Sequence, residues 1–465
     1  MVILIHFFAN YLLQEVDKKT KNLDNRFDYQ GFTLVGMTGF EPATTRPPDV
    51  YSNRAELHPE SFGCANIVIF NVNNTFHQLF FLNLCDMRVK SAIIAVLTAF
   101  FCSCGGASSP SSDVFGVEKF VPEFAKGFRI DAPTEGESSL ITITNPWQGA
   151  DFEQRIFVSR DGEKAPKGFA GQVVKAPIAR AVCLSSGYVA MFDALGEIEK
   201  VKGVSGINFI TNEYIRNPQS QVADVGYDAN LDFERIVALR PDVVMMYGVA
   251  GENATMTSKL RELGIPYIYI GDYVEQSPLG KAEWIYVVAE LTDNHAKADS
   301  LFGAVKQNYQ SLASRVVAET ERRPKVMLNT PYRDIWFLPS AENYMVRLIA
   351  DAGGEAYAST AEGNASQPID SERAYLMASG ADVWLNVGGC TSLAELTAQN
   401  PRFAQMPVVR KLRVYNNNRR RTSAGGSDFW ESGIVRPDII LRDLVAILHP
   451  EILGAEELAY YEQLR

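Results

Sequence analysis

From about residue 179 onward, short apolar runs typical of buried strands alternate with stretches whose apolar residues recur every three or four positions, as on one face of a helix. The run 181–184, for example, is followed by a Ser-Ser-Gly turn and then by a helical pattern over 188–195. The same order continues to a last helix at 437–448. Such alternation predicts an α/β protein with mainly parallel sheets and helices on both faces.

One helical stretch is much longer than the others and extends from about residue 279 to 321. Its apolar residues form a single stripe at the period of a helix, and the polar residues 292–294 favour a break within it. We expect a backbone helix at 278–322 to link an N-terminal lobe at 178–277 with a C-terminal lobe at 323–465. With a helix as the connection, we expect the two lobes of such a bilobed protein to move little relative to one another.

Residues 113–177 have a different pattern, in which apolar and polar residues alternate as in half-buried strands. Two strands are expected, at 139–144 and 154–159. Asp161-Gly162 is typical of a hairpin turn and predicts a return into a strand at 172–174. We therefore expect a small β-rich addition before the first lobe.

The sequence Asp-x-Glu-Arg begins at Asp232 in the first lobe and at Asp370 in the second, and each copy leads into a helix and then a strand. Each aspartate is placed to accept hydrogen bonds from the free N–H groups of the first helical turn. Glu234 and Glu372 suit the positive end of the helix dipole. The repeat predicts two similar lobes, each with one exposed glutamate at a matching place.

Composition narrows the class of protein. The formal charge of −11 argues against nucleic-acid binding, which needs a basic face, and five histidines are too few for a histidine-rich metal site. The lobes contain neither a Gly-x-Ser-x-Gly elbow nor a phosphate-binding glycine loop, so we do not expect an enzyme. Cys183 and Cys390 fall in different lobes, and we expect both to be free, buried thiols.

Residues 87–103 have the order of features of a secretory signal peptide: a basic start at Met87, an apolar run, and a small residue before a cysteine. The Ser103-Cys104 end resembles a bacterial lipobox, which implies a lipid on Cys104, with residues 104–112 as a flexible tether. A plain signal peptide or a buried helix is the alternative interpretation.

Because a signal peptide lies at the start of a chain, residues 1–86 are expected to be a spurious upstream translation. Their Gly-Phe-Glu-Pro at 39–42 can be encoded by the antisense strand of a transfer-RNA T arm. A genuine N-terminal extension is the alternative. Whether the lipid on Cys104 would anchor the chain to an inner or an outer membrane stays open.

Between about residues 175 and 450, several phrases resemble a known family in their order along the chain. They lie at 180–185, 193–196, 201–204, 224–226, 232–242, 259–266 and 436–438. The chain is similar to the periplasmic-binding-protein family for cobalamin, ferric siderophores and haem, the substrate-binding subunits of type II ABC importers. The resemblance implies a metal chelate as ligand, no further cofactor, and a location on the periplasmic face of the cell envelope.

The resemblance also implies a membrane partner. In the family, one acidic residue at the tip of each lobe pairs with arginines of a permease dimer that works with ATPase subunits. Glu234 and Glu372 match that position, where charge would steer docking; the alternative is that each is only a favourable residue at a helix start. Other open functions are a surface lipoprotein that captures ligand without a permease and, less readily, a hydrolytic enzyme on the same fold.

Ligands of α/β lobes bind beyond the carboxyl ends of the parallel strands. Aromatic side chains there would give flat walls for a macrocycle or a catecholate, and arginines would pair with carboxylate or phosphate groups unless they lie on a solvated turn. A metal that arrives already chelated needs no side-chain ligand, although Tyr247, Tyr273 and Tyr332 are candidates for a tyrosinate ligand of haem. The candidate ligand-binding residues are Ser185, Ser186, Tyr188, Tyr247, Tyr273, Tyr332, Arg333, Trp336, Arg419, Arg420 and Trp430.

Overall fold

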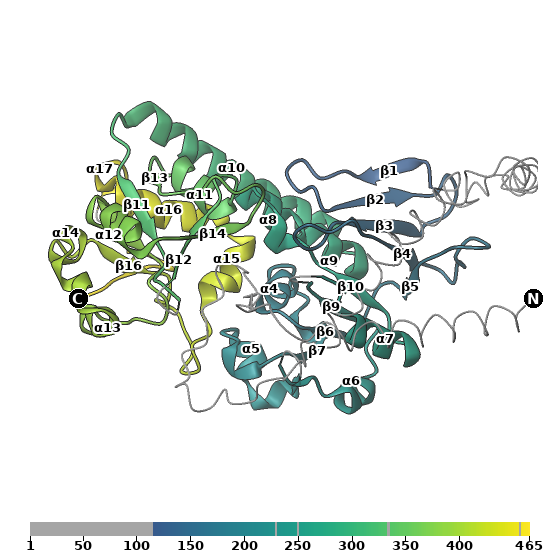
Figure 1. Ribbon diagram of the computed structural model, residues 1–465. Coiled ribbons are helices and arrows are strands. Elements are labelled where there is room, and N and C mark those ends of the chain that lie inside the picture. Colours follow the sequence, from purple (N-terminus) through teal and green to yellow (C-terminus); the bar gives the residue numbers. More distant parts are fainter. Residues whose placement is uncertain (1–114, 228–229, 249–250, 333–334, 455–456) are drawn as a thin grey trace, which may run out of the picture. The chain divides into compact units, whose positions relative to one another are not determined.

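The computed structural model describes residues 115–465 apart from 228–229, 249–250, 333–334 and 455–456. The expectations for residues 1–86, for the signal peptide at 87–103 and for the lipidated Cys104 lie outside the described residues, as does Arg333. The described part contains three five-stranded sheets and one two-stranded sheet, whose elements are labelled in Figure 1. None of its helices is long and apolar enough to cross a membrane.

The N-terminal addition is a five-stranded sheet in the order β1-β2-β3-β4-β5. Its strands are β1 (Val117–Phe120), β2 (Phe128–Ala132), β3 (Ser139–Thr144), β4 (Glu153–Ser159) and β5 (Gln172–Lys175). The strands predicted at 139–144 and 154–159 are confirmed as β3 and β4. The hairpin predicted at Asp161-Gly162 is wrong: the turn is present, with Gly162 at a φ of +76°, but β5 pairs parallel to β4. Parallel pairing requires a crossover, which residues 160–171 supply.

The first lobe is built on a parallel sheet in the order β10-β9-β6-β7-β8. Its elements are β6 (Ala181–Cys183), α4 (Ser186–Ala194), β7 (Val201–Val204), α5 (Glu213–Arg216), β8 (Ala223–Asp224), α6 (Phe233–Leu239), β9 (Val243–Met246), α7 (Ala254–Glu262) and β10 (Tyr267–Tyr269). The central strands β6 and β9 consist of buried residues only, as expected of parallel strands that are covered on both faces. The predicted parallel α/β architecture is confirmed for this lobe.

Three consecutive helices follow: α8 (Pro278–Glu283), α9 (Ile285–Thr292) and α10 (His295–Glu319). The break expected at residues 292–294 is confirmed, because Asp293 takes a left-handed φ of 56° and ends α9. All residues of α9 are buried, whereas α10 buries a single stripe along its length. The long helix α10 leads from the first lobe into the second (Figure 1).

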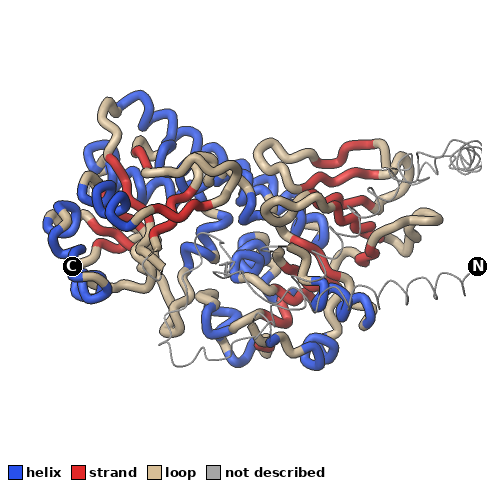
Figure 2. Tube along the Cα trace, in the orientation of Figure 1, coloured by secondary structure: helices blue, strands red, loops and turns tan. Residues whose placement is uncertain are grey.

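The second lobe repeats this plan with a sheet in the order β13-β11-β15-β16-β17, in which β17 alone is antiparallel to its neighbour. Its elements are β11 (Lys325–Leu328), α11 (Tyr344–Asp351), β13 (Glu355–Ala356), α12 (Ser371–Ser379), β15 (Val383–Leu385), α13 (Leu393–Gln399), α14 (Pro407–Arg410), β16 (Val414–Asn416), α15 (Ser432–Val435), α16 (Pro437–Leu448), α17 (Pro450–Leu453) and β17 (Glu462–Gln463). Strand β12 (Trp336–Pro339) pairs with β14 (Ser366–Ile369) in a separate antiparallel sheet. Figure 2 shows that helices and strands alternate in both lobes.

The repeated Asp-x-Glu-Arg phrase starts a helix in each lobe, as predicted. The Asp232 carboxylate accepts a hydrogen bond from the Arg235 N–H at 2.9 Å. Asp370 accepts from the N–H groups of Glu372 and Arg373 at 2.9 and 3.1 Å. Each aspartate therefore satisfies donors that the first turn of a helix leaves unused.

Asp242 and Asp382, which follow the helices that the two copies begin, have a structural role that the sequence did not predict. Asp242 accepts hydrogen bonds from the N–H groups of Ala179 and Arg180, directly before β6. Asp382 accepts one from the N–H of Lys325, at the start of β11. β9 pairs with β6 and β15 with β11, so each aspartate ties the starts of two neighbouring parallel strands.

The N-terminal sheet shares a core with the first lobe. Ile141 and Ile156 of this sheet belong to the same buried cluster as Val182 and Val244 of β6 and β9. The addition therefore packs as a layer of the first lobe.

Two glutamine side chains cover the outer edge of the first-lobe sheet, where β10 is the edge strand. Gln154 donates to the carbonyl of Tyr267 and accepts from the N–H of Tyr269, both at 2.9 Å. Gln172 bonds the carbonyl and the N–H of Tyr267, again at 2.9 Å. A side-chain amide offers a donor and an acceptor as a peptide group does, so the two glutamines act in place of a further strand.

Two buried glutamates, Glu275 and Glu283, bind the segment of the N-terminal addition between β1 and β2. The backbone N–H groups of residues 123–127 donate to the carboxylates of Glu275 and Glu283, which are 4% and 2% exposed. Burial raises the pKa of both carboxyls, although these hydrogen bonds act in the opposite direction. The turn between β1 and β2 is thus held by two carboxylates of the first lobe.

Glu290 of α9 forms a charged cluster beneath the sheet. Its fully buried carboxylate lies 3.0 Å from Lys119 and 2.8 Å from Arg160, and it also bonds Ser139 and His295 at 2.5 Å. Burial by itself would raise the pKa of Glu290, but the hydrogen bonds and the two cations outweigh it and lower the pKa below its usual range. Glu290 is thus a fully buried carboxylate with four side-chain partners, of which Lys119 and His295 reach the surface.

Candidate functional site

A pocket lies where strands of the first-lobe sheet end, and the second lobe closes its other side. The segments after β6, β7 and β9 contribute Ser185, Ser205 and Tyr247. The second lobe contributes residues 425–427 and Trp430. The space within the pocket, counted together with the open solvent at its mouth, is about 600 Å³. The carboxyl ends of parallel strands are the place where α/β folds bind ligands.

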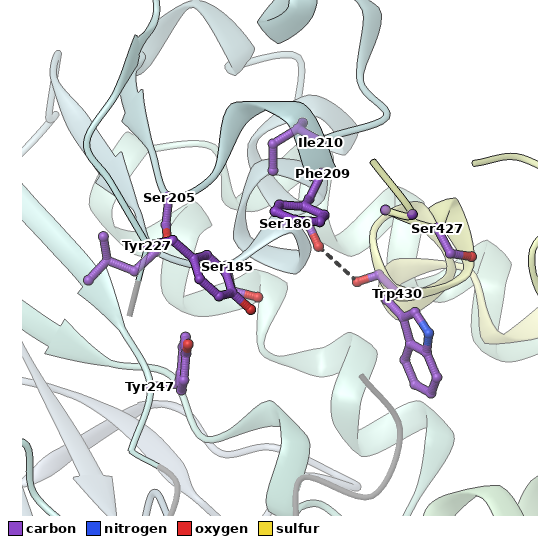
Figure 3. A pocket seen from close by; sticks show the side chains of 12 residues that line it. Ser185, Ser186, Ser205, Phe209, Ile210, Tyr227, Tyr247, Ser427 and Trp430 are labelled. Atoms are coloured by element: carbon purple, nitrogen blue, oxygen red, sulfur yellow. Dashed lines mark hydrogen bonds between the residues drawn. The ribbon is translucent and has the colours of Figure 1, made fainter. Parts of the chain in front are cut away.

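The lining is neutral, aromatic and rich in hydroxyl groups. No lysine, arginine, histidine, aspartate or glutamate is among the described residues that line the pocket. Figure 3 shows side chains of the first lobe on one side and Ser427 and Trp430 on the other. The lining residues are Leu184, Ser185, Ser186, Ser205, Phe209, Ile210, Tyr227, Tyr247, Gly425, Gly426, Ser427 and Trp430.

Strands β6 and β7 bring Ser185 and Ser205 to the same end of the sheet. Cys183 pairs with Val204 in register, and the N–H of Ser205 donates to the carbonyl of Cys183 at 3.1 Å. Ser185 is the N-cap residue of α4, but its side chain makes no capping hydrogen bond. Its hydroxyl lines the pocket instead.

The two lobes meet at the rim of the pocket. A Cβ atom at Gly426 would lie 1.8 Å from the carbonyl oxygen of Phe209, so no side chain fits there while the lobes are in contact. The Ser186 hydroxyl approaches the carbonyl of Trp430 at 3.4 Å (Figure 3). Ser186 and Phe209 of the first lobe and Gly426 and Trp430 of the second all line the pocket. The shape of the pocket therefore depends on how closely the two lobes approach one another.

Glu431 also joins the lobes. Its buried carboxylate accepts hydrogen bonds from the N–H groups of Thr211 at 2.7 Å and Asn212 at 2.8 Å. Burial raises the pKa of Glu431 to about 7, although these donors act in the opposite direction. A buried Glu431 therefore holds its proton more strongly than an exposed glutamate does.

Four predicted ligand-binding residues line the pocket: Ser185, Ser186, Tyr247 and Trp430. The structure corrects the placement of Tyr188 and Trp336, each 1% exposed.

The two misplaced aromatic residues are part of the core. The Tyr188 hydroxyl donates to the carbonyl of Ile270 at 3.3 Å. The indole N–H of Trp336 donates to the carbonyl of Leu328 at 3.0 Å. Burial of a large ring together with a partner for its polar atom is the usual arrangement of tyrosine and tryptophan inside a protein, and it leaves neither ring available to a ligand.

The structure also corrects the expected role of the arginines. Arg419 forms an ion pair with Glu457. Arg420 pairs with Asp428 at 2.8 Å and lies 4.6 Å from the centre of the Tyr460 ring. Neither arginine is among the described residues that line the pocket.

Two of the three candidate tyrosinate ligands lie away from the pocket lining. The Tyr273 hydroxyl donates to the carbonyl of Gly248, and burial raises the pKa of Tyr273, which disfavours a tyrosinate there. Tyr332 is 39% exposed, and its backbone bonds that of Ile335. Tyr247 is the candidate of the three that lines the pocket.

Several lining residues were missed from the sequence, among them Ser205, Phe209, Tyr227 and the segment 425–427. Ser205 had a usable signal, because it ends the apolar run at 201–204 and such strand ends form ligand sites. Tyr227 follows a strand of only two residues, which has no apolar run to mark it. The segment 425–427 reaches the pocket from the other lobe, and no local pattern indicates that.

A larger hollow, of about 1490 Å³ with open solvent included, is bordered by the N-terminal addition, α8, α10 and α11. None of its described lining residues directly follows a parallel strand. Its charged residues include Arg347 and Asp351, which pair with each other at 3.0 Å. We therefore assign the ligand site to the smaller pocket between the lobes.

Glu234 and Glu372 are both exposed in the first turn of their helices, α6 and α12. Glu372 lies 2.9 Å from Arg402, and both side chains are mostly exposed. One turn further on, each helix also exposes an apolar residue, Val237 at 42% and Leu376 at 75%. The two lobes thus present similar surfaces, each with an acidic residue beside an apolar one.

The fold and the pocket together define a two-lobed solute-binding protein. The chain belongs to the periplasmic binding protein family, whose model matches residues 181–419. The match begins at β6 and leaves the N-terminal sheet outside it.

Curated relatives and solved structures share this similarity. An uncharacterised lipoprotein of Methanocaldococcus jannaschii is 25% identical in an alignment of 346 positions that covers 69% of this chain and 80% of that protein. A second lipoprotein of that organism is 24% identical over 329 residues, 68% and 82% of the two chains. A periplasmic haem-binding protein from Pseudomonas aeruginosa is 19% identical, with a TM-score of 0.47 and coverage of 62% of this chain and 98% of that one. A periplasmic vitamin B12-binding protein of Vibrio cholerae is 16% identical, with a TM-score of 0.43 and coverage of 60% and 99%.

Proposed function

We propose that the protein is the lipid-anchored solute receptor of an ABC importer, which captures a metal chelate between its lobes and delivers it to a membrane permease. The observation that carries the proposal is a pocket at the strand ends, lined by both lobes of a member of the periplasmic binding protein family. A ferric siderophore, a cobalamin or a haem is the proposed ligand. The rings of Phe209, Tyr227, Tyr247 and Trp430 offer flat surfaces to such a molecule.

Docking to the permease is assigned to Glu234 and Glu372. In the first lobe, Tyr227 lines the pocket and α6 begins soon after Tyr227. Glu234, in the first turn of α6, and the pocket therefore both follow the carboxyl ends of strands of the same sheet. Complementary charge steers association, while exposed apolar residues such as Val237 and Leu376 are typical of interaction surfaces. Anchoring is assigned to Cys104, and the lipoprotein names of the relatives support it.

An uptake assay tests this function. Cells carrying wild-type protein or Glu234→Lys/Glu372→Lys would be supplied with ferric citrate, cyanocobalamin or haemin, and accumulation would be measured. We expect the double variant to lose uptake while the purified protein still binds the same probe, because both glutamates lie outside the pocket lining. The matched control is Glu262→Lys/Glu355→Lys, which reverses one exposed glutamate in each lobe away from α6 and α12. Normal uptake in the first double variant would contradict permease docking and favour ligand capture without a permease.

A further inference from the structure

The start of α4 presents unused hydrogen-bond donors at the pocket. The N–H groups of Ser186 and Gly187 donate to none of the described residues, as is usual in the first turn of a helix. Ser185 occupies the N-cap, yet its hydroxyl makes no capping bond. Because α4 has nine residues, its aligned peptide dipoles add a partial positive charge at this end.

Ser205 is an independent donor on the neighbouring strand. It is only 9% exposed, and its hydroxyl has no hydrogen-bond partner within the described part of the chain. It lines the same pocket as Ser185, and its backbone is bonded to Cys183, two residues before Ser185. The hydroxyl is therefore available to donate a hydrogen bond to a ligand in the pocket.

Asp224 on β8 and Glu431 beside Trp430 already have partners of their own. Asp224 accepts hydrogen bonds from the N–H groups of Gly206, Ile207 and Gly226. Glu431 is bound to backbone N–H groups of the first lobe. With no charged side chain among the described lining residues, hydroxyls and helix N–H groups are the polar donors that a ligand meets.

We propose that an anionic oxygen group of the ligand, a carboxylate or a phosphate-like group, binds at the N-terminus of α4. The hydroxyls of Ser185 and Ser205 and the N–H groups of Ser186 and Gly187 donate to its oxygens. The inference rests on the proposed function and gives its ligand a chemical handle, with the aromatic residues contacting the remainder. In this proposal, neutral donors bind the anionic group of the ligand, whereas the sequence suggested that Arg419 and Arg420 do so. Helix N-termini favour anions for the same electrostatic reason.

Isothermal titration of the purified protein tests the site with stated probes. Ferric citrate and haemin carry carboxylates on a chelate, molybdate and phosphate are free oxyanions, and ferrioxamine B is a chelate without a free carboxylate. We expect an anionic probe to bind, and Ser205→Ala or Ser185→Ala to raise its Kd about ten- to a hundredfold, the effect of losing one hydrogen bond to a charged group. Ser258→Ala, an exposed serine of α7, is the matched control and should leave the Kd unchanged.

The outcomes separate the possible sources of the anion. Binding of molybdate or phosphate that is weakened by Ser205→Ala indicates a free oxyanion, whereas binding of only ferric citrate or haemin indicates a group on a larger chelate; both support the site. Equal affinity of wild type and both serine variants overturns it, as does the failure of every anionic probe to bind. Binding of ferrioxamine B alone overturns the anion site but leaves the proposed receptor function intact. Circular dichroism during heating would verify that each variant is folded.

Discussion

The first lobe has two polar regions that are built in opposite ways. Beneath the N-terminal sheet, the buried carboxylates of Glu275, Glu283 and Glu290 each accept several hydrogen bonds. At the pocket, Ser185 makes no capping bond and Ser205 has no side-chain partner among the described residues. A fully partnered network fixes one conformation, whereas a buried group without a partner is stabilised when a ligand supplies one. The difference teaches that these buried carboxylates serve structure, whereas Ser185 and Ser205 keep hydrogen-bond donors available to a ligand in the pocket.

Removal of the central carboxylate beneath the sheet is expected to have the largest effect. Glu290→Ala removes the buried one of the two carboxylates that pair with Arg160, leaving only Asp293, and should lower the free energy of unfolding by about 3 kcal/mol. Urea unfolding would measure the change, with Glu118→Ala on the exposed face of β1 as the matched control. Ligand affinity of the folded protein should not change. A loss of less than about 1 kcal/mol would show that this network is not structural.

The glutamines at the sheet edge should have a smaller effect. Gln154→Ala/Gln172→Ala removes the partners of Tyr267 and Tyr269 on β10 and should cost about 2 kcal/mol, because buried backbone groups lose their hydrogen bonds. Hydrogen exchange should become faster at the amides of these two tyrosines. The exposed Gln219→Ala serves as the control. Unchanged protection of both amides would mean that the N-terminal sheet does not need the glutamines to cover this edge.

The pH dependence of stability gives the smallest and most specific effect. Because the pKa of Glu290 is lowered in the folded protein, its stabilisation is present above the pKa of an unfolded glutamate, about 4.3, and is lost as the pH falls below that value. Between pH 5 and 3.5 the wild type should lose about 1 kcal/mol more of its free energy of unfolding than Glu290→Gln does. Urea unfolding at the two pH values would measure this. Equal losses in both proteins would show that Glu290 titrates normally in the folded state.

The architecture could be predicted because it depends on local patterns. Alternation over 139–144, the apolar stripe of 437–448 and the polar break at 292–294 each reflect the burial of one short segment, and each matches an observed element or boundary. Asp232 and Asp370 were identifiable as N-caps because capping involves residues only two or three positions apart. The direction of β5 was not predictable from Asp161-Gly162, because a turn does not determine how far the chain continues before it pairs.

The pocket was predictable only where it follows a strand that the sequence reveals. Ser185 and Tyr247 come directly after clear apolar runs. Both are therefore predicted by the tendency of ligands to bind at the carboxyl ends of parallel strands. Arg420 was misassigned because its partners, Asp428 and the ring of Tyr460, are brought to it by the fold of the second lobe. Gly426 could not be found because its role is a contact with the other lobe.

The central claim is that solute binds between the lobes, and Gly426 allows the most direct test. Any side chain at this position would overlap the carbonyl of Phe209, and overpacking of about 1–3 kcal/mol corresponds to about a ten- to hundredfold rise in Kd. Native mass spectrometry would compare wild-type and Gly426→Val protein isolated from the same host cells. We predict that wild type carries a bound solute of defined mass and that the variant, although folded, has lost it. The same bound mass at the same occupancy in both proteins would contradict binding in this pocket.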